Sequence, residues 1–548
     1  MKTELRERNI DALEERVFDS LIIGAGINGA VSGAALSAQG AKVCLIDQGD
    51  FGSLTSQESS NLVWGGIKYM ENSEFGLVRK LCRARNQLLR AYPTNVREIR
   101  FLTTIEKGFR HRPLILWIGT WLYWAIGRGF TRKPRLLSKR AIAQDEPNIR
   151  LSNSTGGFEY SDAYLPGNDA RFVFDFVQKT NANGCVTINY LESLGSHREG
   201  DQWITQVRDR VSGHESIIRS KTLINACGPF VDEHNRLSHI TTRHRHLFSK
   251  GIHLIVKRVT GGNRILAFFA SDGRLFFVIP MGPVSCLGTT DTRVEEVTDT
   301  ATPEDRHFVL DNINRCLDLD PPLTEADIIS ERCGVRPLVV DTEGKNRDKG
   351  DWSSLSRKHA IEIDRDKRHL CIFGGKLTDC LNVGDEVVKA IGEMQIGLRP
   401  QDSDWFGEPP RSDFESFQQR ATELRIDDRT PAHFSEPISL RLWRRYGRDA
   451  GPLLDAIAGD ETMGQVLIEG TAFLRCEIHR AARDEMIVNL DDFLRRRTKI
   501  ALTVPRDSLR EDPGMREACD VLFGNDANAR FKEYFSSDSA DLEKGPGR

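Results

Sequence analysis

The sequence predicts an α/β protein, α+β overall, in which a Rossmann-like domain is joined to an antiparallel-sheet domain and a C-terminal cap domain of helices. Three observations predict this fold. An apolar run near the N-terminus breaks into spaced glycines and a small-residue helix, residues 253–291 alternate in polarity, and amphipathic helices follow Pro400. At 548 residues, the chain is long enough for two or three domains.

The first element is a strand and turn that begin at residue 18. Residues 18–23 read as a buried strand, and they lead through Gly24-x-Gly26-x-x-Gly29 into a helix over about 30–38. Gly24 allows the turn, Gly26 lets the backbone approach a pyrophosphate, and Gly29 lets helix and strand pack closely. The helix N-terminus would then face the phosphates of a dinucleotide.

A second strand, residues 42–46, ends on Asp47. In a dinucleotide fold, a carboxylate about 20 residues beyond the glycines accepts the adenosine ribose hydroxyls. An aspartate rather than an arginine at this point argues against a ligand with a 2′-phosphate.

Two small-residue segments follow. Residues 48–60 are rich in hydroxyl groups and predict either a hydrogen-bonding loop at the ligand or a solvent loop. Residues 61–70 place Gly65 and Gly66 beside aromatic side chains, which suggests backbone lying close to a flat ligand.

These segments resemble the FAD-dependent glycerol-3-phosphate dehydrogenases, and the likeness extends over nearly the whole chain. The later motifs follow in that family's order: NACGP (225–229), KGIH (250–253), GTTD (288–291), GVRPL (334–338), FGGKLT (373–378), RRYG (444–447) and DDFLRRRT (491–498). The resemblance implies that FAD is the cofactor and that sn-glycerol 3-phosphate is oxidised to dihydroxyacetone phosphate. Hydride would pass to flavin N5, and the electrons would pass to quinone.

The predicted domains are interleaved along the chain. The FAD-binding parts are expected at about 17–95, 180–235 and 340–400, the substrate-domain parts at about 96–179 and 236–339, the helical domain at 401–530, and a disordered tail at 531–548.

The expected cofactor-binding residues come from the glycine turn, the hydroxyl-rich loop, the double-glycine segments and two later motifs. They are Gly24, Gly26, Asn28, Gly29, Asp47, Thr55, Ser56, Ser59, Ser60, Gly65, Gly66, Gly228, Gly375, Lys376, Leu377 and Thr378.

A phosphorylated alcohol requires cations for its phosphate and a base for its hydroxyl proton. Arg336 is the leading phosphate ligand, because its fork can bind two oxygens and Pro337 stiffens the backbone beside it. Lys376 is second, and by resemblance both residues, together with Arg357, match basic substrate-contacting positions. His253 matches a histidine of the family and could be the base, although a lone histidine on a strand is more often a core residue.

The chain departs from the family at three positions. Trp64 stands where the family usually has histidine, Lys68 where it has arginine, and Asp379 where a threonine usually follows the GGKLT motif. Trp64 cannot accept a proton. Lys68 has the same positive charge as the family's arginine, but it lacks the two-pronged guanidinium group. These departures motivate one alternative, an oxidoreductase for a different anionic alcohol or amine. Two others remain open: an oxidase that produces hydrogen peroxide, since oxygen reactivity depends on access to the flavin, and an inactive flavoprotein scaffold.

Residues 114–126 are apolar and carry three tryptophans, with a basic flank between Arg128 and Arg140. Thirteen residues are too few to cross a bilayer, which requires about 20. They could lie in the membrane interface or form a buried helix. Because bacterial members of the family are monotopic membrane enzymes, the resemblance favours the interface and the cytoplasmic face of the inner membrane, with a cytoplasmic protein as the alternative.

Composition also indicates whether nucleic acid or a metal ion is to be expected as a partner. The net charge of −3 gives no reason to expect nucleic-acid binding. The eleven cysteines contain no C-x-x-C pair, so buried thiols in a reducing compartment are expected rather than a metal site. The charged N-terminus is not expected to be a secretory signal, and a homodimer is compatible with the resemblance.

Overall fold

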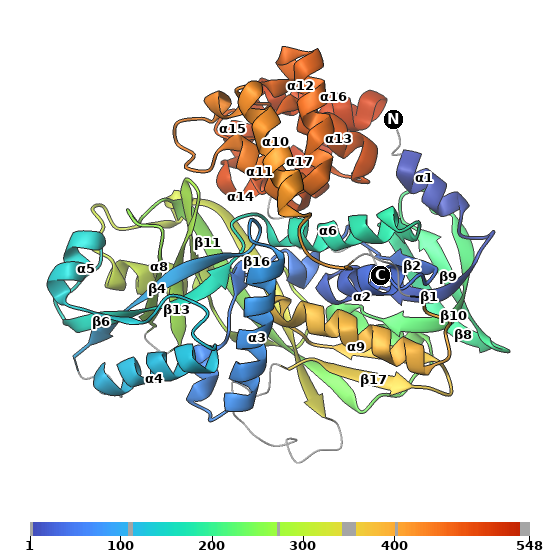
Figure 1. Cartoon of the computed structure of the whole chain (residues 1–548), viewed down its shortest axis with the longest axis horizontal. Coiled ribbons are helices and arrows are strands. Elements are labelled where there is room, and N and C mark those ends of the chain that lie inside the picture. Colours follow the sequence, from blue (N-terminus) through green and yellow to red (C-terminus); the bar gives the residue numbers. More distant parts are fainter. Residues whose placement is uncertain (1–3, 108–112, 271–273, 342–357, 400–403, 537–548) are drawn as a thin grey trace.

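The computed structural model describes residues 4–107, 113–270, 274–341, 358–399 and 404–536. Two sheets lie side by side beneath a layer of C-terminal helices, and strands far apart in sequence alternate between the sheets (Figure 1). Arg357, one of the expected substrate-contacting residues, lies outside the described residues.

The first sheet has the order β17-β18-β10-β1-β2-β7, in which the five strands from β18 to β7 run parallel. β17 pairs antiparallel with β18, while β8 and β9 form a hairpin that is attached to β10. Its strands are β1 (Val17–Ile23), β2 (Val43–Ile46), β7 (Val186–Ile188), β8 (Leu191–Glu199), β9 (Gln202–Asp209), β10 (Glu215–Asn225), β17 (Ala360–Asp364) and β18 (His369–Phe373).

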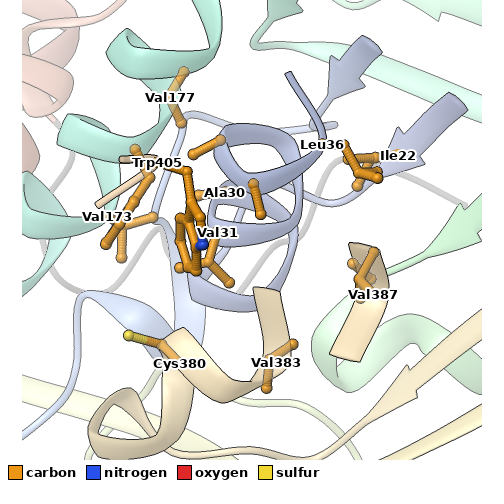
Figure 2. Close-up of a cluster of buried hydrophobic side chains, with 14 of the residues drawn as sticks. Ile22, Ala30, Val31, Leu36, Val173, Val177, Cys380, Val383, Val387 and Trp405 are labelled. Carbon is orange, nitrogen blue, oxygen red and sulfur yellow. The ribbon is translucent and has the colours of Figure 1, made fainter. Parts of the chain in front are cut away.

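Three helices pack together over this sheet: α2 (Ile27–Ser37), α6 (Asp169–Ala182) and α9 (Cys380–Glu393). Figure 2 shows the contact, where Val31 of α2, Val173 of α6 and Val383 of α9 meet around Trp405. The small residues of α2 allow this close approach, and burying their apolar surface provides the main stabilisation.

The second sheet is mostly antiparallel, with the order β15-β11-β14-β13-β12-β4-β6-β3, and β16 and β5 pair with β11 and β6. Its strands are β3 (Leu62–Val63), β4 (Arg97–Glu106), β5 (Arg135–Leu137), β6 (Ser154–Tyr164), β11 (His244–Lys257), β12 (Ile265–Phe269), β13 (Leu275–Met281), β14 (Val284–Gly288), β15 (Thr292–Val294) and β16 (Ile328–Asp341). One face packs on α8 (Pro303–Cys316), and the opposite face carries Phe101, Phe277 and Ile279.

The helical elements outside the first sheet fall into two groups (Figure 1). Besides α8, those in the N-terminal three-quarters of the chain are α1 (Glu4–Asp11), α3 (Phe75–Ala91), α4 (Pro113–Ile126), α5 (Lys139–Asp145) and α7 (Val231–Leu237). The C-terminal domain contains α10 (Arg411–Glu423), α11 (Ile438–Tyr446), α12 (Gly451–Gly459), α13 (Arg475–Asp484), α14 (Ile500–Thr503), α15 (Arg506–Glu511), α16 (Pro513–Phe523) and α17 (Ala527–Ser536).

Two boundaries differ from those expected. Helix α6 begins at Asp169 and packs on α2, so it lies with the first sheet although the substrate part was expected to continue to residue 179. Helix α17 continues to Ser536 and buries Phe531 and Phe535, so the ordered chain extends into the predicted tail.

Helix α4 turns its aromatic residues inward. Tyr123 is buried and Trp117 is half-buried, whereas Leu114, Ile115 and Ile118 are 62%, 56% and 54% exposed. The exposed face is therefore aliphatic rather than aromatic. Within the described ranges, no helix is both long enough and apolar enough to traverse a bilayer.

Candidate active site and cofactor cradle

The glycine turn between β1 and α2 has the geometry that its sequence predicts. Gly24 has φ +97°, and a Cβ there would lie 2.4 Å from the carbonyl oxygen of Ala226. A Cβ on Gly29 would lie 1.8 Å from the carbonyl oxygen of Gly24, so α2 can approach β1 only with glycine here. Gly26 caps α2 without contributing a capping side chain, which leaves the helix N-terminus available to a phosphate.

Asp47 holds this turn from the end of β2. Its carboxylate accepts hydrogen bonds from the backbone N–H of Ala25 (2.6 Å) and Gly49 (2.9 Å). Burial raises the pKa of Asp47 to about 6, and the two backbone N–H groups oppose that rise. The carboxylate is thus fixed at the wall of a cavity where ribose hydroxyls could donate to it.

That cavity, of about 850 Å³, runs along the turn. Eight of the expected cofactor-binding residues contribute to its walls: Gly24, Gly26, Asn28, Asp47, Thr55, Ser56, Gly228 and Gly375.

The cavity wall fits an elongated dinucleotide. The buried Asn28 Oδ1 has no hydrogen-bond partner in the described chain, whereas its Nδ2 donates to the carbonyl oxygen of Gly374 (2.8 Å). Gly375 has φ +122°, and a Cβ there would lie 3.0 Å from Asn28 Oδ1. The Gly374–Gly375 segment therefore closes the cradle that begins at the glycine turn after β1.

The other expected cofactor residues contact protein groups. Gly29 packs against the turn, and the Ser59 hydroxyl and N–H both donate to Asp169. Leu377 packs against the core of the first sheet, and the Thr378 hydroxyl donates to the carbonyl oxygen of Trp64 (3.3 Å).

Gly65 and Gly66 are shaped by their neighbours. A Cβ on Gly65 would lie 2.1 Å from the hydroxyl of Tyr123 in α4, and Gly66 has φ +80°. The Gly65 N–H donates to the buried carboxylate of Asp162 (3.1 Å), which also accepts from Tyr123 (2.6 Å) and Arg85 (3.0 Å). This network, which sequence patterns did not reveal, fixes the Trp64–Gly66 loop to α4.

Strand β16 is the common wall of the candidate substrate site. The Thr55 hydroxyl donates to the carbonyl oxygen of Val335 (2.7 Å), and a Cβ on Gly334 would lie 2.5 Å from Cβ of Glu58. On the other side, a Cβ on Gly374 would lie 3.6 Å from the carbonyl oxygen of Pro337. The hydroxyl-rich loop, Arg336 and the segment before Lys376 are thereby brought side by side.

Arg336 crosses from β16 onto β11. It pairs with Ser249 in register, and its guanidinium occupies the space that a side chain at Gly251 would fill, 2.2 to 2.5 Å from an ideal Cβ. Its Nη2 donates to the hydroxyl of Thr289 (2.8 Å), and Asp291 lies 3.7 Å away. The Thr-Thr-Asp motif therefore orients the guanidinium, and its side chain remains 27% exposed.

His253 lies two residues beyond Gly251, on the same face of β11. A hydrogen bond of 3.0 Å joins its Nε2 to the Ser60 hydroxyl, and Nδ1 is buried with no partner in the described residues. Burial lowers the pKa of His253 well below its ordinary 6.5, and the charges of Arg332 and Arg336 add to the shift. The imidazole is therefore neutral at physiological pH.

The two lysines of the candidate site differ in their surroundings. The Lys376 ammonium donates to the Tyr69 hydroxyl (2.6 Å) and lies 4.0 Å from the centroid of the same ring, whereas Lys68 is exposed. Trp64 packs beside Tyr69, with ring centroids 5.9 Å apart. Tyr69 was not among the expected site residues, although it stands in the motif that contains Lys68.

Asp379, one of the departures from the family pattern, is held in an ionic cluster. Its carboxylate lies 3.0 Å from His359 and 3.1 Å from Lys80 of α3. Although burial opposes it, hydrogen bonds from His359 and Asn382 lower the pKa of Asp379. This position ties α3 to the start of α9.

The fold and cradle define an FAD-dependent oxidoreductase. Residues 19–350 match the family described as FAD dependent oxidoreductase, and residues 413–527 match the C-terminal domain of alpha-glycerophosphate oxidase. Glycerol-3-phosphate dehydrogenase 2 of Mycobacterium bovis is 30% identical over 498 residues, which cover 89% of this chain and 82% of that protein. The chain belongs to the FAD-dependent glycerol-3-phosphate dehydrogenase family, and its cofactor is FAD.

Other relatives agree with this assignment. The aerobic glycerol-3-phosphate dehydrogenase of Staphylococcus saprophyticus is 28% identical over 521 residues, covering 91% of this chain and 89% of that one. The glycerol-3-phosphate dehydrogenase of Bacillus halodurans, crystallised with FAD, superposes with a TM-score of 0.73 at 22% identity, over 98% of this chain and 97% of the other. The fold is shared over almost the full length.

Proposed function

We propose that this enzyme oxidises sn-glycerol 3-phosphate to dihydroxyacetone phosphate and passes the electrons to quinone. The observation that carries the proposal is the pairing of an oriented guanidinium, Arg336, with a neutral imidazole, His253, on one face of β11. A phosphorylated alcohol needs both groups. The names of the relatives support the substrate.

In the proposed mechanism, Arg336 binds the substrate phosphate with its fork, and Lys376 adds a second cation from the loop after Gly375. Thr289 and Asp291 keep the guanidinium in place, so little conformational freedom is lost when the phosphate binds. This fixes the distance between the phosphate and the carbinol carbon.

His253 takes the hydroxyl proton. With Nε2–H donating to Ser60, the free lone pair is on Nδ1, which has no other partner among the described residues and is the nitrogen that would accept the proton. FAD, when bound, supplies the acceptor for the hydride at N5. The carbinol thereby loses a hydride and a proton and becomes the ketone.

Anaerobic mixing with glycerol 3-phosphate tests this proposal. Bleaching of the flavin absorption band is the expected result, and an unbleached flavin would favour the inactive-scaffold alternative. Hydrogen peroxide, measured during turnover with and without a quinone analogue, separates dehydrogenase from oxidase. A phosphate-free alcohol or an amine oxidised equally well would favour a different substrate, the alternative that Trp64 motivates.

The exposed face of helix α4 supports the proposal that the enzyme reaches quinone at the cytoplasmic face of the inner membrane. The helix's exposed aliphatic face is followed in the chain by the exposed Arg132 and Lys133, a combination suited to acyl chains and anionic headgroups. Through Tyr123 and Asp162, the same helix holds Gly65 near the proposed flavin site.

Replacing Leu114, Ile115 and Ile118 together with serine should release the enzyme from membranes. Because these side chains are exposed, FAD content and folding should be unchanged, while binding to anionic vesicles should fall at least about tenfold. Vesicle co-sedimentation measures the change. The matched control is Val211→Ser with Ile217→Ser, which removes exposed apolar groups from the β9–β10 hairpin, and equal effects of both variants would argue against α4 as the contact.

The cofactor should be released when the protein is denatured. The cradle offers backbone, hydroxyl and amide groups, and its walls include the Cys227 thiol, whose pKa burial raises well above 9.0. Acid precipitation should leave FAD in the supernatant, quantified by its absorbance. Flavin retained on the precipitated polypeptide would contradict non-covalent binding.

A further inference from the structure

A second cavity, of about 530 Å³, lies between the C-terminal helices and the antiparallel sheet. Its walls come from α11, the β13–β14 turn, the segment after β6 and residues 497–499. Figure 1 shows α11 and α14 above β11 and β16, and the Ser330 hydroxyl of β16 donates to the carbonyl oxygen of Leu502 in α14 (3.0 Å). The cavity is thus enclosed by two domains.

Its walls are strongly basic. Eight arginines and one lysine contribute to them, against two carboxylates, Glu98 and Glu436. Arg444 binds Glu436 through two nitrogens, and Arg97 binds the same carboxylate at 2.9 Å. One glutamate therefore balances two arginines.

Carboxylates behind the walls balance other cations. Arg441 forms a two-point ion pair with Glu477, and Arg171 pairs with Glu485 at 2.5 Å. The remaining pairs of this kind are Arg332 with Asp169 (3.5 Å) and Arg497 with Asp50 (2.7 Å).

Three cations are left without a close carboxylate. Arg258 donates to the carbonyl oxygens of residues 260, 262 and 282, and Lys499 donates to that of residue 166. Among the described residues, neither forms an ion pair. Arg445 has Glu477 and Glu485 only at 3.6 and 3.8 Å.

Buried N–H groups also lack acceptors here. Arg332 Nε, Arg441 Nε and Arg445 Nη2 have no hydrogen-bond partner in the described chain, and these side chains are at least nine-tenths buried. An unsatisfied buried donor costs about 1–3 kcal/mol. Burial, with a further contribution from the charge of Arg444, lowers the pKa of Lys499 to about 8, and Glu436 opposes the shift.

We propose that this cavity is a second anion site, which binds a small molecule through a phosphate group. The donors come from β16, α11 and residue 499, so they approach from several directions and suit an anion with several acceptor oxygens rather than a flat carboxylate. The volume lies within the range of small-molecule sites. Occupancy would join the C-terminal domain to the substrate domain.

The second site is separate from the proposed reaction site. Ser60 borders both sites, because it lines the second cavity and its hydroxyl forms a hydrogen bond with His253. Arg336 and Lys376 are absent from the described walls of the cavity. Phosphate binding in the second cavity therefore does not depend on which substrate the enzyme oxidises.

Calorimetric titration of the FAD-loaded Arg336→Ala enzyme with inorganic phosphate tests the inference. One phosphate per chain should bind, and adding Lys499→Met should weaken binding at least tenfold. Lys257→Met, an exposed lysine at the end of β11, is the matched control and should change nothing. No binding to Arg336→Ala, or equal binding with and without Lys499, would overturn the inference.

A second measurement covers the case in which Lys499→Met fails to fold. Crystals of the FAD-loaded parent enzyme soaked in selenate should show an anomalous peak among Arg332, Arg441 and Lys499. A cavity without that peak would overturn the inference. Failure of the proposed reaction is distinguishable, because Arg336→Ala would then leave phosphate binding unchanged while Lys499→Met still weakened it.

Discussion

Arg336→Ala should lower kcat/KM for glycerol 3-phosphate at least about a hundredfold. A charge-assisted hydrogen bond is worth roughly 1.5–3 kcal/mol, and a guanidinium that binds a phosphate at two points makes two of them. The phosphate is remote from the reacting carbon, so its loss weakens positioning as well as affinity. The expected change in activation free energy is about 3 kcal/mol or more.

Steady-state kinetics of three variants measure this effect. Arg336→Lys should recover only part of the loss, since a point charge does not reproduce the fork. Arg293→Ala removes an exposed arginine from β15 and should be nearly neutral. FAD content should remain constant throughout, and near-normal turnover of Arg336→Ala would remove this residue from the site.

His253→Asn should lower kcat by roughly 10²- to 10⁴-fold, the usual contribution of a general base. Asparagine keeps a polar amide near the position of Nδ1 but cannot accept the proton, so FAD binding should persist while turnover fails. Rapid mixing without oxygen measures the rate of flavin reduction directly. His197→Asn, at an exposed position on β8, is the control.

The pH profile gives a second test of His253. A base works in its neutral form, and the pKa of His253 lies well below 6.5. The flavin reduction rate of the parent should therefore stay level as the pH falls from about 8 to 6.5, and should decline only at lower pH. A decline centred on 6.5 would point to a different, solvent-exposed base.

The parts of the fold that were predicted correctly depend on local periodicity. The strand over residues 42–46 and the glycine turn follow from apolar runs and from backbone that only glycine can adopt, as the φ of Gly24 shows. Asp47 was identifiable because its distance from the turn is set by one strand–helix–strand unit. Arg336 was likewise predictable, because it lies in the GVRPL motif that the chain shares with the family.

Other features depend on neighbours distant in sequence. Ser59 looks like a ligand-binding hydroxyl, yet both its donors go to Asp169, which is 110 residues away. The inward orientation of Tyr123 in α4 follows from its contacts with Gly65 and Asp162, which periodicity cannot reveal. The walls of the basic cavity come from both α11 and β16, so no single segment of sequence could predict it.

The interleaving of the two sheets has a consequence for biosynthesis. β1 pairs with β10, β10 pairs with β18, and the side chain of Asn28 is anchored to Gly374. A ribosome that has released only the N-terminal turn and β10 has therefore produced an incomplete cradle. FAD can make its full set of contacts only after Gly375 has left the exit tunnel, when about two-thirds of the polypeptide has been translated.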